Sequence, residues 1–119
     1  MSAESEFHAL LSGHAPLAAL VGGHIARNAI QQGPSAFVVY ASVHAPVYGL
    51  NGELHADQVT FSVQCWARTA SGADAVADEV VAALSGAGAI RGATVLERAD
   101  AHDAETGLDC VSLSIEWWQ

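Results

Sequence analysis

Residues of two kinds alternate without interruption in Val59-Thr60-Phe61-Ser62-Val63-Gln64-Cys65-Trp66-Ala67, the clearest structural signal in the chain. Successive side chains of a strand point to opposite faces, so this alternation predicts a strand. Its odd-numbered residues are apolar and form one face. Its even-numbered residues, Thr60, Ser62, Gln64 and Trp66, form the other. The pattern predicts a sheet with one face packed on a core.

A helical pattern follows this strand directly. Ser71 is the expected N-terminal cap, with Asp74 three residues later, and Gly86 and Gly88 mark the expected end. The apolar positions recur at helical spacing and form one stripe: Ala73, Val76, Ala77, Val80 and Leu84. This stripe predicts a helix that packs against a sheet.

Hairpins are predicted on both sides of this strand–helix unit. Residues 37–43 form a β-branched and aromatic run, which predicts a strand. Residues 44–56 carry turn residues, including Asn51-Gly52, and are expected to form a long loop or hairpin tip. A second hairpin is predicted from residues 93–101 and 108–118, with a turn at Asp103–Gly107. In its last strand Val111, Leu113, Ile115 and Trp117 share one face.

The N-terminal part predicts two short helices. One covers residues 3–12, and the second is opened by Pro16 and ended by Gly22-Gly23. The element order is helix-helix-strand-strand-helix-strand-strand. It predicts a single α+β domain over residues 1–119, with an antiparallel sheet of about four main strands and helices packed on one face.

Composition limits the partners of this chain. Its net charge is −9, and four arginines with no lysine supply the positive charge. A sequence-reading nucleic-acid site needs a basic patch, and an anionic membrane attracts one, so both are disfavoured. Hydrophobic residues make up 51% and charged residues 14%. This balance fits either an Ala-rich and Gly-rich domain or a surface that faces other subunits.

The sequence contains no recognisable catalytic or metal-binding motif. The six histidines lack metal-ligand spacing, and there is no nucleophile elbow or phosphate loop. We therefore expect no catalytic residue, no cofactor and no metal ligand, and we expect the acidic residues of 100–109 to form a solvated turn. Cys65 and Cys110 are expected to be buried free thiols, although a disulfide between neighbouring strands stays open.

Aromatic residues are the best candidates for contacts with other proteins. Tyr40, Trp66 and Trp118 are expected on strand faces opposite the main apolar set. They either complete the second face of the sheet or meet a neighbouring subunit. The candidate interface residues are Tyr40, Tyr48, Asn51, Trp66, Trp117 and Trp118.

Together these segments resemble a known family, the small tail-completion or tail-terminator proteins of long-tailed bacteriophages and phage-derived gene transfer agents. His24 stands where the family often has arginine, and Ser35-Ala36 separate Pro34 from the first core strand. The matching segments are Leu17–Ile25, Phe37–Tyr40, Val59–Trp66 with the Ala73–Leu84 helix, Asp103–Gly107 and Ser112–Trp118.

The resemblance implies a structural, non-enzymatic role. It implies a ring, typically of six copies, that sits on the head-proximal end of the tail tube and stops tube growth. The expected partners are the tail tube protein, a head-side connector or stopper protein, and DNA that passes through the ring without sequence-specific binding. No membrane partner is implied. The resemblance also implies synthesis in the bacterial cytoplasm, followed by incorporation into a phage, a defective prophage particle or a gene transfer agent.

Two other functions stay open at the level of sequence. One is a different neck or tail component, such as a head-completion stopper or a tube-like subunit. The other is a small ligand-binding or enzymatic domain, which would need a pocket with converging polar groups. Under the tail interpretation, we expect residues 44–56 to protrude and to touch the tube or the connector.

Overall fold

The computed structural model describes residues 3–27, 36–48, 54–86, 94–105 and 107–118. These residues form helices and strands in an α+β arrangement. In chain order they are α1 (Ala3–Ser12), α2 (Ala15–Val21), β1 (Ile25–Arg27), β2 (Phe37–Tyr48), β3 (Leu54–Ala67), α3 (Ala70–Gly86), β4 (Thr94–Asp103) and β5 (Leu108–Trp118). In the described part of the chain, no helix has the length and apolar character needed to cross a membrane.

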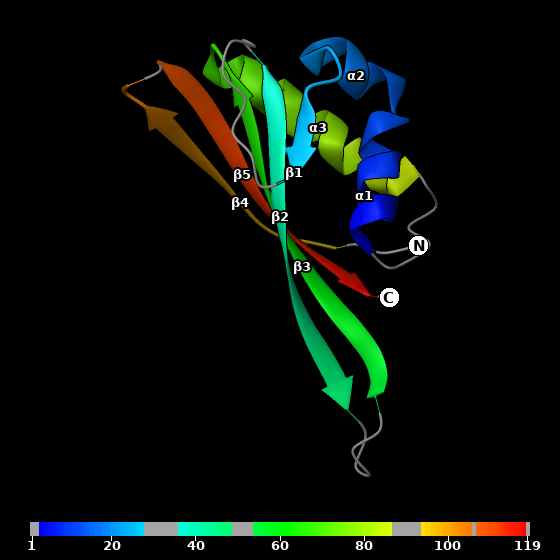
Figure 1. Ribbon diagram of the computed structural model, residues 1–119. Coiled ribbons are helices and arrows are strands. Elements are labelled where there is room, and N and C mark those ends of the chain that lie inside the picture. The colour runs from blue at the N-terminus through cyan, green and yellow to red at the C-terminus, as the bar shows by residue number, and fades with distance from the viewer. Residues whose placement is uncertain (1–2, 28–35, 49–53, 87–93, 106, 119) are drawn as a thin grey trace.

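The strands form a five-stranded mixed sheet in the order β1-β2-β3-β5-β4, and the helices lie on one of its faces (Figure 1). The prediction of an α+β domain with helices on one face is confirmed. The prediction of about four antiparallel strands is incomplete, because β1 pairs parallel with β2 and places Ile25 beside Val38. Three residues are too few to show an alternation, so the sequence could indicate only a short extended piece at Ile25.

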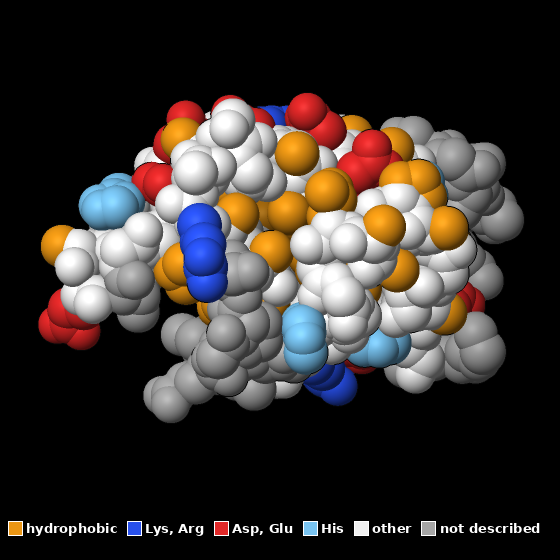
Figure 2. Space-filling model, turned by 90° about the horizontal axis from the view of Figure 1, so that it is seen from above, with side chains coloured by type: hydrophobic (Ala, Val, Ile, Leu, Met, Phe, Trp, Pro, Cys, Tyr) orange, Lys and Arg blue, Asp and Glu red, His pale blue; other side chains and the backbone are white. Residues whose placement is uncertain are grey.

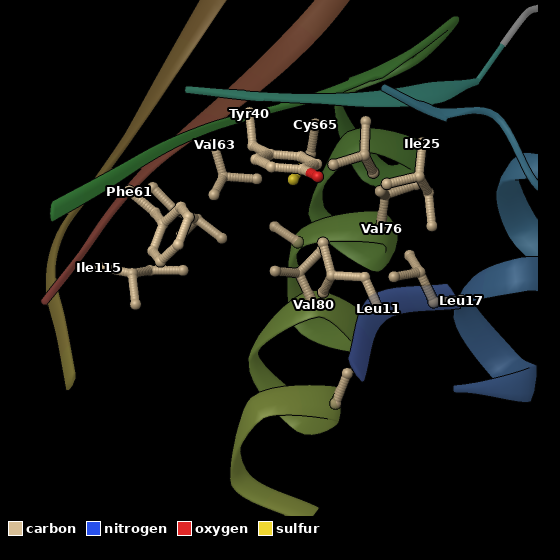
Figure 3. Packing of buried hydrophobic residues seen from close by; sticks show 14 of the residues in the cluster. Leu11, Leu17, Ile25, Tyr40, Phe61, Val63, Cys65, Val76, Val80 and Ile115 are labelled. Atoms are coloured by element: carbon tan, nitrogen blue, oxygen red, sulfur yellow. The ribbon is translucent and has the colours of Figure 1, made fainter. Parts of the chain in front are cut away.

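The core lies between the sheet and the helices (Figure 3). The predicted apolar face of β3 is confirmed, since Val59, Phe61, Val63 and Cys65 are fully buried. Phe7 of α1 is also fully buried, and the centroid of its ring lies 4.0 Å from the centroid of the Phe61 ring. The helices and the sheet are therefore joined by aromatic as well as aliphatic packing.

Tyr40 lies on the helix face, and its predicted position on the opposite face is wrong. Register places it beside Val63, which in turn lies beside Leu113. Residues 37–40 are apolar throughout, so no alternation distinguishes their two faces. Pairing with β3 determines the face on which Tyr40 lies, because it fixes the direction of every side chain in β2.

Helix α3 is capped by Thr69 rather than by Ser71. The backbone N–H of Gly72 donates to Thr69 Oγ1 at 3.0 Å, and the helix begins at Ala70. Thr69 and Ser71 are both suitable caps, and local sequence does not choose between them. The predicted buried stripe from Ala73 to Leu84 is confirmed.

The predicted loop over residues 44–56 is mostly strand. β2 continues to Tyr48 and β3 starts at Leu54, while the pairing of β3 with β5 ends at Gln58. Residues 46–48 and 54–57 therefore form a two-stranded ribbon, here called the arm, that projects from the body (Figure 1). The predicted Asn51-Gly52 turn lies outside the described residues. Pro46 is tolerated in a strand because β2 is an outer strand here among the described elements.

Candidate subunit and partner interface

Four of the described histidines are engaged by neighbouring side chains. None of the described His, Cys, Asp and Glu side chains gather in groups of three or more that could hold a metal ion. The observed pairs are His8 Nδ1 with the Tyr40 hydroxyl at 3.0 Å, His14 Nε2 with Glu79 at 2.8 Å, His44 Nε2 with Glu4 at 2.8 Å and His102 Nδ1 with Asp109 at 2.9 Å. Each pair joins two different segments of the chain. These histidines therefore act as structural links.

Both cysteines are buried free thiols, as predicted. Cys65 lies on the helix face beside Val111, whereas Cys110 pairs with Trp66 and points to the other face. Opposite faces of a sheet keep these thiols from forming the disulfide that the sequence left open. Burial, together with the nearby Cys110, raises the pKa of the Cys65 thiol to about 12. Cys65 is therefore a neutral thiol at pH 7 and a poor nucleophile.

The acidic residues before β5 build a turn. Asp103 Oδ1 accepts a hydrogen bond from the Glu105 backbone N–H at 3.0 Å, and its carbonyl accepts one from Gly107 at 2.8 Å. Gly107 has a φ of 72°, which a residue with a side chain adopts at a cost. Asp109 is held by His102. Three side chains of this segment, those of His102, Asp103 and Asp109, thus have structural contacts at the turn.

The six candidate interface residues fall into three structural groups. Tyr40 and Trp117 are 3% and 2% exposed, and the core of this chain accounts for their burial. Trp66 is half-buried on the open face, and its ring stacks on that of Phe37 with a centroid distance of 6.0 Å. The backbones of Tyr48 and Trp118 lie in β2 and β5, and Asn51 lies outside the described residues. Whether any of the six contacts another subunit stays a prediction.

Small polar residues line the sheet face that the helices leave open. Ser62 lies beside Ser114, and Gln64 beside Ser112, so two adjacent rows of the sheet carry uncharged polar groups. Glu97 pairs with Ser114 from the outer strand β4. The alternation in the sequence predicts these polar positions. Their alignment on one continuous surface requires the pairing of β3, β5 and β4.

Negative charge dominates the surface electrostatics. Arg98 donates to Asp78 at 2.9 Å and to Asp74 at 3.2 Å, so carboxylates of α3 neutralise this arginine. Figure 2 looks onto the end of the molecule opposite the arm. It shows acidic side chains along one margin and separate basic ones, with no continuous basic patch among the described side chains in view. This arrangement does not provide the charge that gripping a nucleic acid requires.

Comparisons with known proteins agree with one another. The family described as "Tail completion protein gp17" matches residues 6–119. Among solved structures, one chain from "Virion of native gene transfer agent (GTA) particle" matches with a TM-score of 0.71 and 17% identity, over 94% of this chain and 90% of that chain. At that identity the likeness shows a shared fold. A comparison with curated protein sequences found no match.

Proposed function

The chain belongs to the tail completion protein gp17 family and so has a structural role in a phage-type tail, and from this premise we propose that it is a tail terminator. In this proposal, six copies form a ring on the head-proximal end of the tail tube. The ring stops the addition of tube subunits and offers a surface to the head-side connector. The observation that carries the proposal is the family match over residues 6–119.

The shape of the molecule supports a role between two other structures. Its dimensions are 51 × 28 × 20 Å, and the arm extends its long axis. The arm carries β2 and β3 beyond the last residue that β5 pairs, so it has backbone free for partners along both sides in the described structure. We assign the arm to contact with the tail tube or with the connector.

The charge of the chain supports passage of DNA without retention. Six copies carry a formal charge of 6 × −9 = −54. The open face presents serine and glutamine side chains together with Glu97 and Glu116. Phosphates are repelled by carboxylates and gain no ion pairs from serine or glutamine. We therefore assign the open face to the lumen of the ring.

Gene deletion in a producing strain tests the proposed function. Electron microscopy of the particles measures tail length and head attachment, with the wild-type gene supplied in trans as the control. We expect overlong tails without heads, restored to normal by the supplied gene. Tails of normal length that fail to join heads would instead identify a head-side stopper, and wholly normal particles would exclude a tail role.

The lumen and the arm each have a separate test in complemented particles. Replacing Glu97 and Glu116 by lysine is expected to slow DNA release and to lower the yield of functional particles, whereas glutamine at both sites should have a smaller effect. Replacing residues 46–57 by a short turn is expected to leave the body folded and to abolish joining. Normal DNA transfer in the lysine variant, or normal joining without the arm, would overturn the respective assignment.

A further inference from the structure

Strand pairing alone gives the arm little support at its root. The pairing of β1 with β2 ends at Tyr40, so from Ala41 onward β2 pairs only with β3 among the described elements. On the other side of the ribbon, the pairing of β3 with β5 ends at Gln58, the residue next to the arm. A two-stranded ribbon is marginally stable by itself. The direction of the arm therefore depends on what else contacts its root.

Helix α1 makes a side-chain contact at this root. Register with the buried residues of β3 places Ser42 and His44 on the helix face of β2. Glu4 Oε2 lies 2.8 Å from His44 Nε2, and the Ser42 hydroxyl donates a further hydrogen bond to Glu4. Glu4 is thus joined to the two helix-face positions of β2 that precede Pro46, the first residue of the arm.

The helix that carries Glu4 is itself fixed to the body. Phe7 lies one turn further along α1 and is fully buried, and its ring stacks on that of Phe61 with a centroid distance of 4.0 Å. His8 Nδ1 lies 3.0 Å from the Tyr40 hydroxyl, which gives a second link between α1 and β2. Glu4 is 9% exposed, so its surroundings also restrain its carboxylate. A contact from this helix can therefore fix a direction.

We propose that α1 sets the direction of the arm, and that the link between Glu4 and His44 is the contact through which it does so. The link lies two residues before Pro46, close to the point where the ribbon leaves the body (Figure 1). An arm that is already held in one direction loses less conformational freedom when it binds, so its contact with a partner is stronger. This inference rests on the proposed function, which assigns the arm to contact with the tail tube or the connector.

Distance measurements by pulsed electron paramagnetic resonance test the inference. Spin labels are attached to cysteines introduced at Ala56 in the arm and at the exposed Leu20 on α2, because the native thiols are buried. The labelled protein is diluted with unlabelled protein, so that only distances within one copy are measured. We expect one narrow distance distribution for the labelled chain and a broad distribution after His44→Val or Glu4→Ala. A narrow distribution in both variants would overturn the inference.

The chain offers a matched control for these variants. His14 Nε2 and Glu79 also form a link of 2.8 Å, but this link joins the start of α2 to α3 and involves neither strand of the arm. Glu79→Ala removes a contact of the same chemistry and should leave the arm distances narrow. A second label pair, at Leu20 and the exposed Ala99 of β4, lies within the body and should stay narrow in every variant. Broadening in either control would indicate general loosening and would contradict the inference.

A double variant shows whether the two residues act through one contact. Glu4→Ala removes the hydrogen bonds to both His44 and Ser42, so adding His44→Val should broaden the arm distances no further. Broadening in the double variant that equals the sum of the two single effects would mean that Glu4 and His44 act separately. That result would reject the link as the contact that directs the arm.

The inference and the proposed function can fail separately. In complemented particles, His44→Val should lower the share of tails joined to heads and Glu79→Ala should not; normal joining by His44→Val would overturn the role of arm direction. Overlong tails after gene deletion, combined with narrow arm distances in His44→Val, would keep the terminator function and remove this inference. Broad arm distances in His44→Val, combined with wholly normal particles after deletion, would keep the control of the arm by α1 and remove the terminator function.

Discussion

At the residue scale, Trp117 shows how an apparent interface residue becomes a core residue. The sequence analysis places it near the end of the last predicted strand and counts it among the candidate interface residues. In the structure its ring packs edge-on against Phe61 and Phe7, with centroid distances of 5.9 and 6.1 Å. Helix α1 supplies Phe7, so a contact across most of the chain length explains the burial. Its Nε1–H has no hydrogen-bond partner among the described residues.

Truncating Trp117 is therefore expected to destabilise the chain. Trp117→Ala should lower the free energy of unfolding by about 3–5 kcal/mol, because it removes a buried aromatic ring and leaves a cavity. Trp117→Phe should cost less, because a ring stays in place and the N–H donor is removed. Urea denaturation followed by circular dichroism measures both. Equal losses for the two variants would contradict the assignment of Trp117 to the aromatic core.

Glu4 makes the stability of the body depend on pH. Its burial opposes ionisation, but the hydrogen bond and the charge of His44, together with hydrogen bonds from the backbone and from Ser42, outweigh this and hold the pKa of Glu4 below its ordinary value of 4.5. A lowered folded-state pKa gives stability that is present above about pH 4.5 and is lost as the pH falls through the lower folded value.

Glu4→Gln is expected to lower the free energy of unfolding by about 1 kcal/mol near pH 6. The difference from wild type should shrink as the pH falls below 4.5, because the wild-type carboxylate then becomes protonated. Thermal unfolding at a series of pH values measures it. Glu105→Gln, at an exposed turn residue, is the matched control and should change little. A constant difference across the acidic range would show that the charge of Glu4 is not responsible.

At the element scale, one arginine makes the described ion pairs between β4 and α3. Arg98 reaches from β4 to Asp74 and Asp78 on α3, and the Asp78 hydrogen bond is the main reason why the pKa of Arg98 is raised. Exposed ion pairs contribute little to global stability, so the effect of this arginine is expected to be local.

Arg98→Ala is expected to change the unfolding free energy by less than about 1 kcal/mol. Amide hydrogen exchange should increase in β4 and stay unchanged in β3, because only β4 depends on the link to α3. Arg98→Lys should restore little of the exchange protection of β4, because lysine lacks the planar guanidinium that bonds both carboxylates. Uniformly faster exchange in both strands would instead indicate a global role for Arg98.

At the scale of the whole molecule, net charge opposes assembly. Each copy carries −9, so copies that join in the proposed ring repel one another. The exposed large apolar side chains among the described residues, Leu20, Val43, Val95 and Leu96, form no ion pairs when they make contacts between copies. Association is then expected to strengthen with salt.

Raising sodium chloride from low to physiological concentration should increase the mass of the isolated protein in light scattering, because salt screens the repulsion. Dissociation of the protein as salt is added would contradict an apolar junction and would indicate an interface of ion pairs.

Local sequence is sufficient to predict β3 and α3 and the faces that they bury. The alternation in Val59–Ala67 and the stripe from Ala73 to Leu84 are local signals, so they correctly predict which faces are buried. The same segments, in their order, carry the family resemblance that the match over residues 6–119 confirms. The same alternation also predicts the polar face of β3.

Features that depend on pairing between distant segments could not be predicted from local sequence. The parallel partner of β1, the face of Tyr40 and the extension of β2 to Tyr48 all follow from register between strands. Turn-type residues such as Pro46 predict a loop locally, but hydrogen bonding to a partner strand keeps the ribbon extended. The exposure of β4 at the end of the sheet is likewise a property of strand order. Periodicity is a local property of the chain, whereas neighbours in a sheet are chosen by contacts over long separations.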